Sequence, residues 1–212
     1  MIHPMAYSET KWIDVALRLQ AIAQAGLTYT ENPYDIDRYE QIREISIGIM
    51  ENHSGLEESF IREVFMAEKG YPTPKVDIRA VIFRDEKILM VRERLDGRWS
   101  IPGGWADVGL SPFEIAEKET REEAGMQVKA LRLLAVLDKM KHNHPPDIYH
   151  AYKLFILCKD QGGTPSPGME TLDAAFFSLN ELPPLSVERN TSEQIELMFE
   201  YFHEPGKQVI CD

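Results

Sequence analysis

The sequence has few cysteines and no long apolar run. Two cysteines occur among 212 residues, Cys158 in an apolar segment and Cys211 next to the last position. Two cysteines exclude a disulfide framework, and neither has the neighbours of a metal-binding motif, so we expect free thiols in the reducing cytoplasm. Apolar runs such as residues 154–158 fall far short of the roughly 20 residues that a membrane-spanning helix needs. The N-terminus lacks the basic start and apolar stretch of a secretory signal.

Positive charge is also scarce. Lysine and arginine number 23 against 35 aspartates and glutamates, which gives a net charge of −12. Such a surface repels phosphate backbones, so we do not expect long nucleic acid as a partner. The lack of a long apolar run argues against a membrane as a partner. A small phosphorylated substrate remains compatible with this charge if a divalent ion lies between carboxylates and phosphates. Hydrophobic residues at 43% and charged residues at 27% are typical of globular proteins.

The first 70 residues favour helices. One apolar stripe at helical spacing begins at Trp12 and has Gly26 as its expected stop; a second covers residues 36–49 after a turn-like stretch, and a third covers residues 57–69. The stripes must be covered, either by the catalytic domain of the same subunit, as a substrate lid, or by a second copy. We favour a symmetric homodimer, the commonest oligomer.

The texture changes after a stretch with two prolines at residues 71–75. Short runs rich in branched residues predict strands, over residues 76–83, 87–91, 131–137, 149–158 and 174–179. Asp85 and Glu86 lie between the first two and predict a hairpin, and residues 192–203 favour a final helix. This order predicts an α+β sandwich after an all-helical N-terminal piece, with domains at residues 1–70 and 71–212.

The most informative segment is residues 101–126, IPGGWADVGLSPFEIAEKETREEAGM. Ser111 as N-cap, Pro112 at the first helical position and Glu114 three residues after the cap predict a helix start with a capping box. Gly125 is the natural stop. The predicted helix is about three turns long.

Three glutamates share one face of this helix. Glu119, Glu122 and Glu123 stand at i, i+3 and i+4, where like charges repel, and the helix dipole disfavours negative charge in the last turn. Mg²⁺ or Mn²⁺ bound by the carboxylates would offset both effects; a solvated acidic face is the alternative. Gly103 and Gly104 just before the helix allow a sharp turn and close approach to a ligand, which favours the metal site.

This segment resembles the Nudix box, G-x5-E-x7-R-E-U-x-E-E-x-G-U, where U is aliphatic. The first glycine of the pattern falls on Gly104, the three later glutamates on Glu119, Glu122 and Glu123, and the last glycine on Gly125. The flanks DGRWSIPGGWADVGLSP and LQAIAQAGLTYTENPYDIDRYEQIREI look like a Nudix branch with an N-terminal helical domain.

Three positions depart from the pattern. Leu110 replaces a glutamate, Lys118 replaces the arginine and Thr120 replaces an aliphatic residue. In the family, that glutamate and arginine form a structural ion pair rather than binding metal. Because both partners differ together, we interpret the change as a different way of anchoring the loop and not as an inactivated site.

The resemblance implies an α/β/α sandwich with a mixed sheet and a metal-dependent pyrophosphatase using Mg²⁺ or Mn²⁺. The substrate would be a nucleoside diphosphate linked to a group X, with ADP-ribose and CDP-choline as leading candidates, and the products a nucleoside monophosphate and phospho-X. It assigns Glu119, Glu122, Glu123 and the Gly104 carbonyl as metal ligands. Glu122 or Glu123 would be catalytic by orienting or deprotonating the water.

Substrate contacts are expected outside the ligand set. An additional acid would be Glu170 or Asp173, with Asp107 as a third choice; an ordinary polar loop is the alternative. Arginines that could clamp a diphosphate, aromatics that could stack on a base and histidines that could reach phosphate or zinc are Arg79, Arg92, Arg98, Trp99, Trp105, Tyr149, His142, His144 and His150. From these groups we select as substrate-binding Arg79, Arg98, Trp105, His144 and Glu170.

Two other functions are compatible with the same residues. A nucleotide-sensing, non-catalytic Nudix regulator would need a basic DNA-binding appendage, which this chain lacks. Hydrolysis of RNA ends uses related chemistry, but the net charge of −12 disfavours a long substrate channel, so it would be a side activity.

Overall fold

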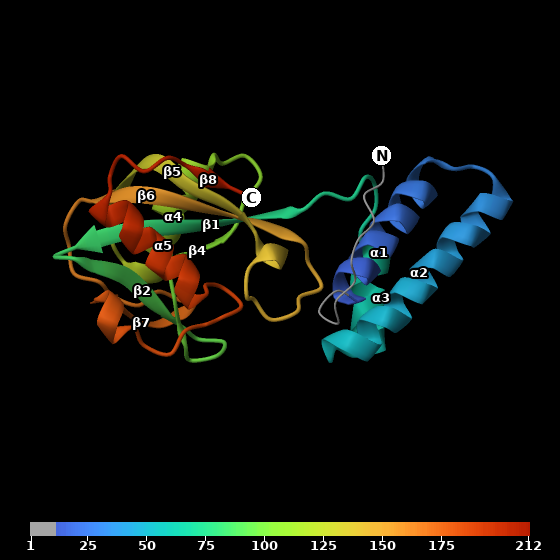
Figure 1. The fold of residues 1–212 in the computed structure, drawn as a ribbon, viewed down its shortest axis with the longest axis horizontal. Coiled ribbons are helices and arrows are strands. Elements are labelled where there is room, and N and C mark those ends of the chain that lie inside the picture. Colours follow the sequence, from blue (N-terminus) through green and yellow to red (C-terminus); the bar gives the residue numbers. More distant parts are fainter. Residues whose placement is uncertain (1–11) are drawn as a thin grey trace. The chain divides into compact units, whose positions relative to one another are not determined.

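The computed structural model describes residues 12–212; residues 1–11, on which the expectation of no secretory signal rests, lie outside that range. The chain divides into two compact units (Figure 1). One contains the residues up to Pro74 together with Pro146–His150, and the other contains Lys75–Pro145 and Ala151–Asp212. No helix in the described part is long and apolar enough to cross a membrane.

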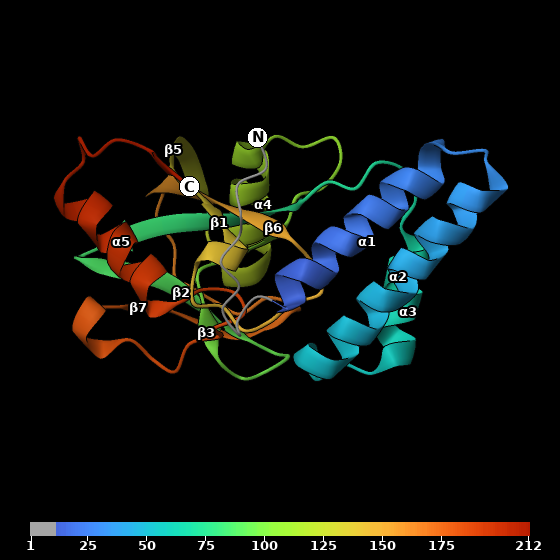
Figure 2. The same cartoon turned by 45° about the vertical axis from the view of Figure 1, so that its right-hand side comes forward.

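Three helices make up the first unit (Figures 1 and 2): α1 Trp12–Tyr29, α2 Pro33–Ser54 and α3 Glu58–Ala67. Asn32 begins α2, because its side chain accepts a hydrogen bond from the Tyr34 N–H and Pro33 occupies a position that needs no amide donor. Gly55 ends α2 in the left-handed conformation, with φ of 72°.

The prediction that Gly26 stops the first helix is wrong. Helix α1 continues through Gly26 to Tyr29. The Tyr39 ring of α2 packs so closely that a Cβ at position 26 would lie 2.4 Å from ring carbons. This glycine therefore permits the close approach of two helices, a role that single-sequence periodicity does not distinguish from a helix stop.

The interior of the helical unit combines apolar packing with polar cross-links. The buried apolar side chains are Ile13, Ala16, Ala23, Ile47, Met50, Ile61 and Phe65. Ser46 Oγ of α2 donates to the Ala16 carbonyl of α1 at 2.7 Å, and Gln20 Nε2 of α1 donates to the Phe65 carbonyl of α3 at 3.0 Å. Large apolar side chains remain exposed on all three helices, among them Trp12, Ile22, Tyr29, Ile45, Phe60 and Met66.

A mixed sheet forms the centre of the second unit (Figure 1). Its strands within the described residues are β1 Lys75–Arg84, β2 Lys87–Glu93, β3 Trp99–Ser100, β4 Gly103–Trp105, β5 Val128–Asp138, β6 Ala151–Asp160, β7 Thr171–Phe177 and β8 Ile210–Cys211. The order is β3-β2-β1-β6-β5-β8, with β4 paired to β1 and β7 paired to β2. Strand β1 runs parallel to β6 and antiparallel to β2 and β4.

Helices α4 (Pro112–Ala124) and α5 (Ser192–His203) belong to two different hydrophobic cores. Ile78 of β1 packs in the core that includes Ile115 of α4, whereas Val81 of β1 packs in the core that includes Ile195 of α5. Because neighbouring strand residues alternate between faces, the sheet is covered by one helix layer on each side. The predicted α/β/α sandwich with a mixed sheet, preceded by helices, is confirmed.

Local signals located most of these elements. Asp85 and Glu86 have φ of 51° and 57°, which is the conformation of a tight hairpin turn. Helix α5 has the predicted bounds, whereas β6 begins at Ala151 and so leaves Tyr149 outside the strand. The short strands β3, β4 and β8 were not predicted, since two or three residues carry no readable alternation.

Candidate active site

The glycine-rich segment lies against the central strand. Gly103 and Gly104 of β4 pair with Arg79 and Ile78 of β1. Gly103 has φ of 148°, and a Cβ there would lie 1.9 Å from the Ile78 carbonyl oxygen. Only glycine fits a backbone with this conformation and this contact. The start of the loop is therefore fixed to the sheet.

Helix α4 brings two glutamates to this loop. Ser111 caps the helix with a complete capping box, and Gly125 ends it in the left-handed conformation, as predicted. A Cβ on Gly104 would lie 3.5 Å from Glu119 Oε2, so the Glu119 carboxylate faces the loop. Glu123 Oε2 accepts a hydrogen bond from the Gly103 N–H at 2.8 Å.

Lys118 forms ion pairs with three carboxylates. Its Nζ lies 3.1 Å from Glu119 Oε1, 3.0 Å from Glu122 Oε2 and 3.2 Å from Asp107 Oδ2. Hydrogen bonds to these carboxylates raise the pKa of Lys118 above its usual value. Two predicted metal ligands, Glu119 and Glu122, thus share the Lys118 ammonium as a partner.

The three glutamates differ in their surroundings. The Glu122 side chain is 51% exposed, that of Glu119 is 13% exposed, and Glu123 is 7% exposed. Burial raises the pKa of Glu123 to about 8, against the Arg79 charge and the Gly103 N–H. Within residues 12–212, no three His, Cys, Asp or Glu side chains gather closely enough to hold one metal ion. The three glutamates lie on one face of α4, but their carboxylates do not converge on one point.

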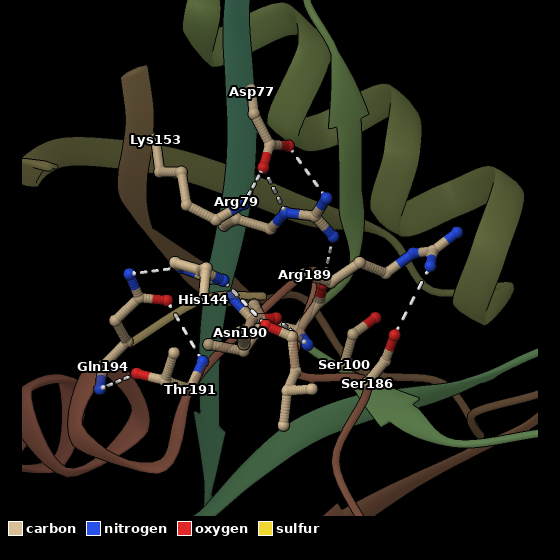
Figure 3. Close-up of polar contacts among 12 residues, drawn as sticks. Asp77, Arg79, Ser100, His144, Lys153, Ser186, Arg189, Asn190, Thr191 and Gln194 are labelled. Carbon is tan, nitrogen blue, oxygen red and sulfur yellow. Dashed lines mark hydrogen bonds and ion pairs between the residues drawn. The ribbon is translucent and has the colours of Figure 1, made fainter. Parts of the chain in front are cut away.

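A buried polar cluster lies on the β1 and β6 side of the loop (Figure 3). Arg79 Nη2 is 2.8 Å from Asp77 Oδ1, and Lys153 Nζ contacts Asp77 Oδ2. Burial lowers the pKa of Lys153 to about 8, against the attraction of Asp77. Arg79 Nη1 donates to the Ile101 carbonyl at 3.1 Å, so this cluster holds the residue that leads into the glycine-rich loop.

A second set of polar contacts reaches the same residue from the start of α5 (Figure 3). Asn190 Oδ1 accepts a hydrogen bond from the Ile101 N–H at 2.8 Å. Thr191 caps α5 with Gln194, and Gln194 Nε2 lies 3.0 Å from His144 Nε2. Ile101 is therefore held through its carbonyl by Arg79 and through its N–H by Asn190.

His144 is neutral in this arrangement. Burial, together with the Lys153 charge, lowers the pKa of His144 to about 4. Its Nδ1 lies 2.7 Å from the Val187 carbonyl, which accepts only, so Nδ1 carries the proton and Nε2 accepts from Gln194.

Comparison with known proteins decides the family. The Nudix domain model matches residues 73–198, and a model described as UDP-X-like, N-terminal oligomerisation domain matches residues 10–65. The chain belongs to the Nudix hydrolases. YjhB of Bacillus subtilis, provisionally named an ADP-ribose pyrophosphatase, is 47% identical over 204 residues, which span 96% of this chain and 98% of that protein.

Solved structures agree with this assignment. A crystal structure of UDP-X diphosphatase is 35% identical, with a TM-score of 0.61 over 95% of this chain and 98% of that one. An ADP-ribose pyrophosphatase from Streptococcus suis is 46% identical, with a TM-score of 0.61 over 66% of this chain and all of that one.

The Nudix segment brings some predicted site residues together. Glu119 faces Gly104 and Glu123 bonds the Gly103 N–H, whereas Asp107, Glu119 and Glu122 are linked through Lys118. Trp105 at the end of β4 is half exposed. Their assignment as ligands, catalytic groups or substrate contacts remains a prediction.

Arg79 is buried and His144 is partly buried, and the side chains of both are engaged by protein groups. Arg79 is 5% exposed, with its guanidinium on Asp77 and the Ile101 carbonyl. The His144 ring lies between Val187 and Gln194. For both residues, the contacts in the structure support positioning of the loop more than contact with a diphosphate.

The other candidates occupy separate places. Arg98 is exposed and its backbone bonds to Asp96 and Glu93. Glu170 is exposed, and its backbone carbonyl accepts a hydrogen bond from the Arg94 N–H. The side-chain contacts of the remaining candidates within the second unit are Arg92 with the Gly97 carbonyl, Asp173 with the Ala174 N–H, Trp99 with Phe177 and His142 with Asp212. Tyr149 and His150 fall in residues 146–150, which group with the helical unit.

Sequence reasoning missed the buried residues that hold the loop. Asp77, Lys153 and Asn190 are each buried and charged or polar. A signal was present for two of them, since Asp77 and Lys153 interrupt runs of apolar strand residues. A charged residue within a buried strand needs a partner, and that requirement would have predicted this pair.

Proposed function

We propose that the protein hydrolyses the phosphoanhydride bond of a nucleoside diphosphate sugar, with ADP-ribose as the first candidate, in a reaction that depends on Mg²⁺ or Mn²⁺. The observation that carries the proposal is that the Glu119 and Glu122 carboxylates converge on the Lys118 ammonium, while the Glu119 carboxylate also faces Gly104. The names of YjhB and of the Streptococcus suis structure favour ADP-ribose, and that of the third relative favours a UDP-linked compound.

The donor set fits a divalent cation. Carboxylate and carbonyl oxygens are the ligands that Mg²⁺ and Mn²⁺ prefer, and Nudix hydrolases generally use these ions. Glu119, Glu122 and the Gly104 carbonyl would hold the ion, with Glu123 as the remaining predicted ligand. Bound there, the ion would shield the diphosphate oxygens and lower the pKa of a coordinated water.

The residues of this chain then divide the remaining work. Glu122 is exposed enough for the attacking water to reach, so we assign it the orientation of that water. Glu123 holds the loop through the Gly103 N–H. Arg79 and Asn190 fix Ile101 from both sides, which keeps the loop in place when a charged substrate arrives.

The helical unit supports a homodimer. Its model is described as an oligomerisation domain, and large apolar side chains stay exposed on its three helices. Light scattering of the full chain tests this part: a mass of two chains is expected, and a mass of one chain contradicts it. The cytoplasmic location rests on two free cysteines, Cys158 and Cys211.

A substrate panel tests the reaction. ADP-ribose, a UDP-sugar, CDP-choline and a short RNA with a 5′-triphosphate are incubated with Mg²⁺, with Mn²⁺ and with EDTA. We expect metal-dependent release of a nucleoside monophosphate, and loss of roughly 100-fold or more in Glu119→Gln and Glu122→Gln. Glu114→Gln is the matched control, because glutamine preserves the capping box at that position.

Three results would contradict the proposal. Turnover that persists in EDTA would contradict the dependence on a metal ion. Full activity in both glutamine variants would contradict the assignment of Glu119 and Glu122 to the site. Tight binding of a nucleotide without any turnover would instead support the regulator, and cleavage of the RNA alone would support the nuclease.

A further inference from the structure

The structure explains the two positions at which this chain departs most from the Nudix pattern. Leu110 stands where the pattern has a glutamate and is 39% exposed, and Lys118 stands where it has an arginine. We propose that Asp107 takes over the part of the missing glutamate, and that Lys118 ties it to Glu119 and Glu122. Asp107 is thus a positioning residue for the metal-binding glutamates, and this inference rests on the proposed function.

Asp107 supplies the carboxylate that Leu110, at the glutamate position of the pattern, does not. Lys118 Nζ is 3.2 Å from Asp107 Oδ2. A turn closed by a hydrogen bond from the Leu110 N–H to the Asp107 carbonyl, 3.3 Å long, folds this part of the loop back on itself. The acid has moved three positions towards Gly104, and the loop is anchored nearer to the residue that faces Glu119.

The same contacts explain why a lysine serves here. An arginine offers a flat fork that suits one carboxylate bound through both oxygens. An ammonium offers three donors that diverge from one point, and Lys118 has three carboxylate partners. The exchange of arginine for lysine therefore matches a change from one partner to three.

The loss of the Asp107 contact is expected to affect geometry more than folding. The Asp107 side chain is half exposed, and exposed ion pairs contribute little to stability. Without it, Lys118 keeps only Glu119 and Glu122, and the loop between Gly104 and Ser111 loses its charged link to α4. Small displacements of groups that align a reaction reduce its rate strongly.

The test compares Asp107→Asn with a variant that restores the family's own pair. Asp107→Asn should lower kcat/KM on the best substrate by about 10-fold and raise the Mn²⁺ concentration for half-maximal activity. In the metal-free protein, the amides of residues 104–110 should exchange with deuterium faster, while the melting temperature stays unchanged. Adding Leu110→Glu and Lys118→Arg to Asp107→Asn should recover most of the activity, the metal response and the slow exchange.

Two controls define the result. Lys129→Met removes the ion pair between Lys129 and Glu117 on another part of α4, which is 3.0 Å long, and should change none of the readouts. Asp107→Glu keeps the charge and should remain near the wild type. Wild-type exchange and metal response in Asp107→Asn would overturn the inference, as would a triple variant that behaves like Asp107→Asn.

The deuterium measurement separates this inference from the proposed function. It needs neither substrate nor metal, so it reports on the link between Asp107 and Lys118 even if no compound in the panel is hydrolysed. Faster exchange in Asp107→Asn that the triple variant reverses would uphold the positioning of the loop while the proposed substrate fails. If the protein hydrolyses the substrate but Asp107→Asn leaves the deuterium exchange unchanged, the proposed function stands and the positioning role of Asp107 is contradicted.

Discussion

Two charged regions flank the glycine-rich loop, and they differ in their contact with water. On the α4 side, Lys118 and Glu122 are partly exposed and join through ion pairs of about 3 Å. On the β1 and β6 side, Asp77, Arg79 and Lys153 are almost completely buried. Charges in contact with water can exchange their partners for a metal and a substrate. Buried charges stay in place, because a charge that lost its partner there would have neither a partner nor water around it. The α4 side is suited to binding a metal and a substrate, and the β1 and β6 side is suited to keeping the loop in a fixed position.

The largest effect on stability is therefore expected in the buried region. Lys153→Met leaves Asp77 with Arg79 alone, and removing one partner of a buried pair costs about 3–5 kcal/mol of unfolding free energy. Lys118→Met is the counterpart on the exposed side and should cost less than about 1 kcal/mol, while lowering activity more than Lys129→Met does. Urea unfolding of the three variants measures this difference. Equal destabilisation by Lys153→Met and Lys118→Met would remove the distinction between the regions.

The loop itself should show a smaller but clear contrast between two glycines. Gly103→Ala puts a Cβ 1.9 Å from the Ile78 carbonyl oxygen at φ of 148°, and we expect a loss of roughly 3 kcal/mol from strain and displacement of β4. Gly109 also has positive φ, but a Cβ there meets open space. Gly109→Ala should lose about 1 kcal/mol. A melting temperature lowered equally by both would show that the β4 contact is not rigid.

The smallest effect concerns pH and the buried side of the site. His144 has a pKa of about 4 in the folded chain against 6.5 as its usual value, so the unfolded chain binds more protons between these values. The contribution of neutral His144 to the unfolding free energy is complete above pH 6.5 and is lost as the pH falls towards 4. Unfolding free energy should therefore drop over this window, and less so in His144→Gln. A slope in His144→Gln equal to that of the wild type would contradict this assignment.

Short-range signals predicted helix α4 and the family well. Ser111 and Gly125 fixed the bounds of α4, and the spacing of Glu119, Glu122 and Glu123 fixed their shared face. These properties depend on backbone geometry over a few residues. The hairpin at Asp85 was predictable for the same reason.

Properties that depend on distant partners were less accessible. Arg79 was predicted to contact substrate because an arginine beside a phosphate site is a natural clamp, but its position opposite Gly103 and its pairing with Asp77 come from strand register. Gly26 was predicted to stop a helix because the approach of Tyr39 is a tertiary contact. His144 lies 50 positions from Gln194, and no spacing rule connects them.

The contact between Asn190 and Ile101 spans 89 positions of the chain. During synthesis, the segment that carries the glycine-rich loop is made long before the asparagine that holds its N–H, and helix α5 follows only at Ser192. A growing chain can therefore form α4 with its cap while the glycine-rich loop still lacks one of its two anchors. Completion of the site is coupled to completion of the second helix layer, so a nascent Nudix unit acquires its final loop geometry last.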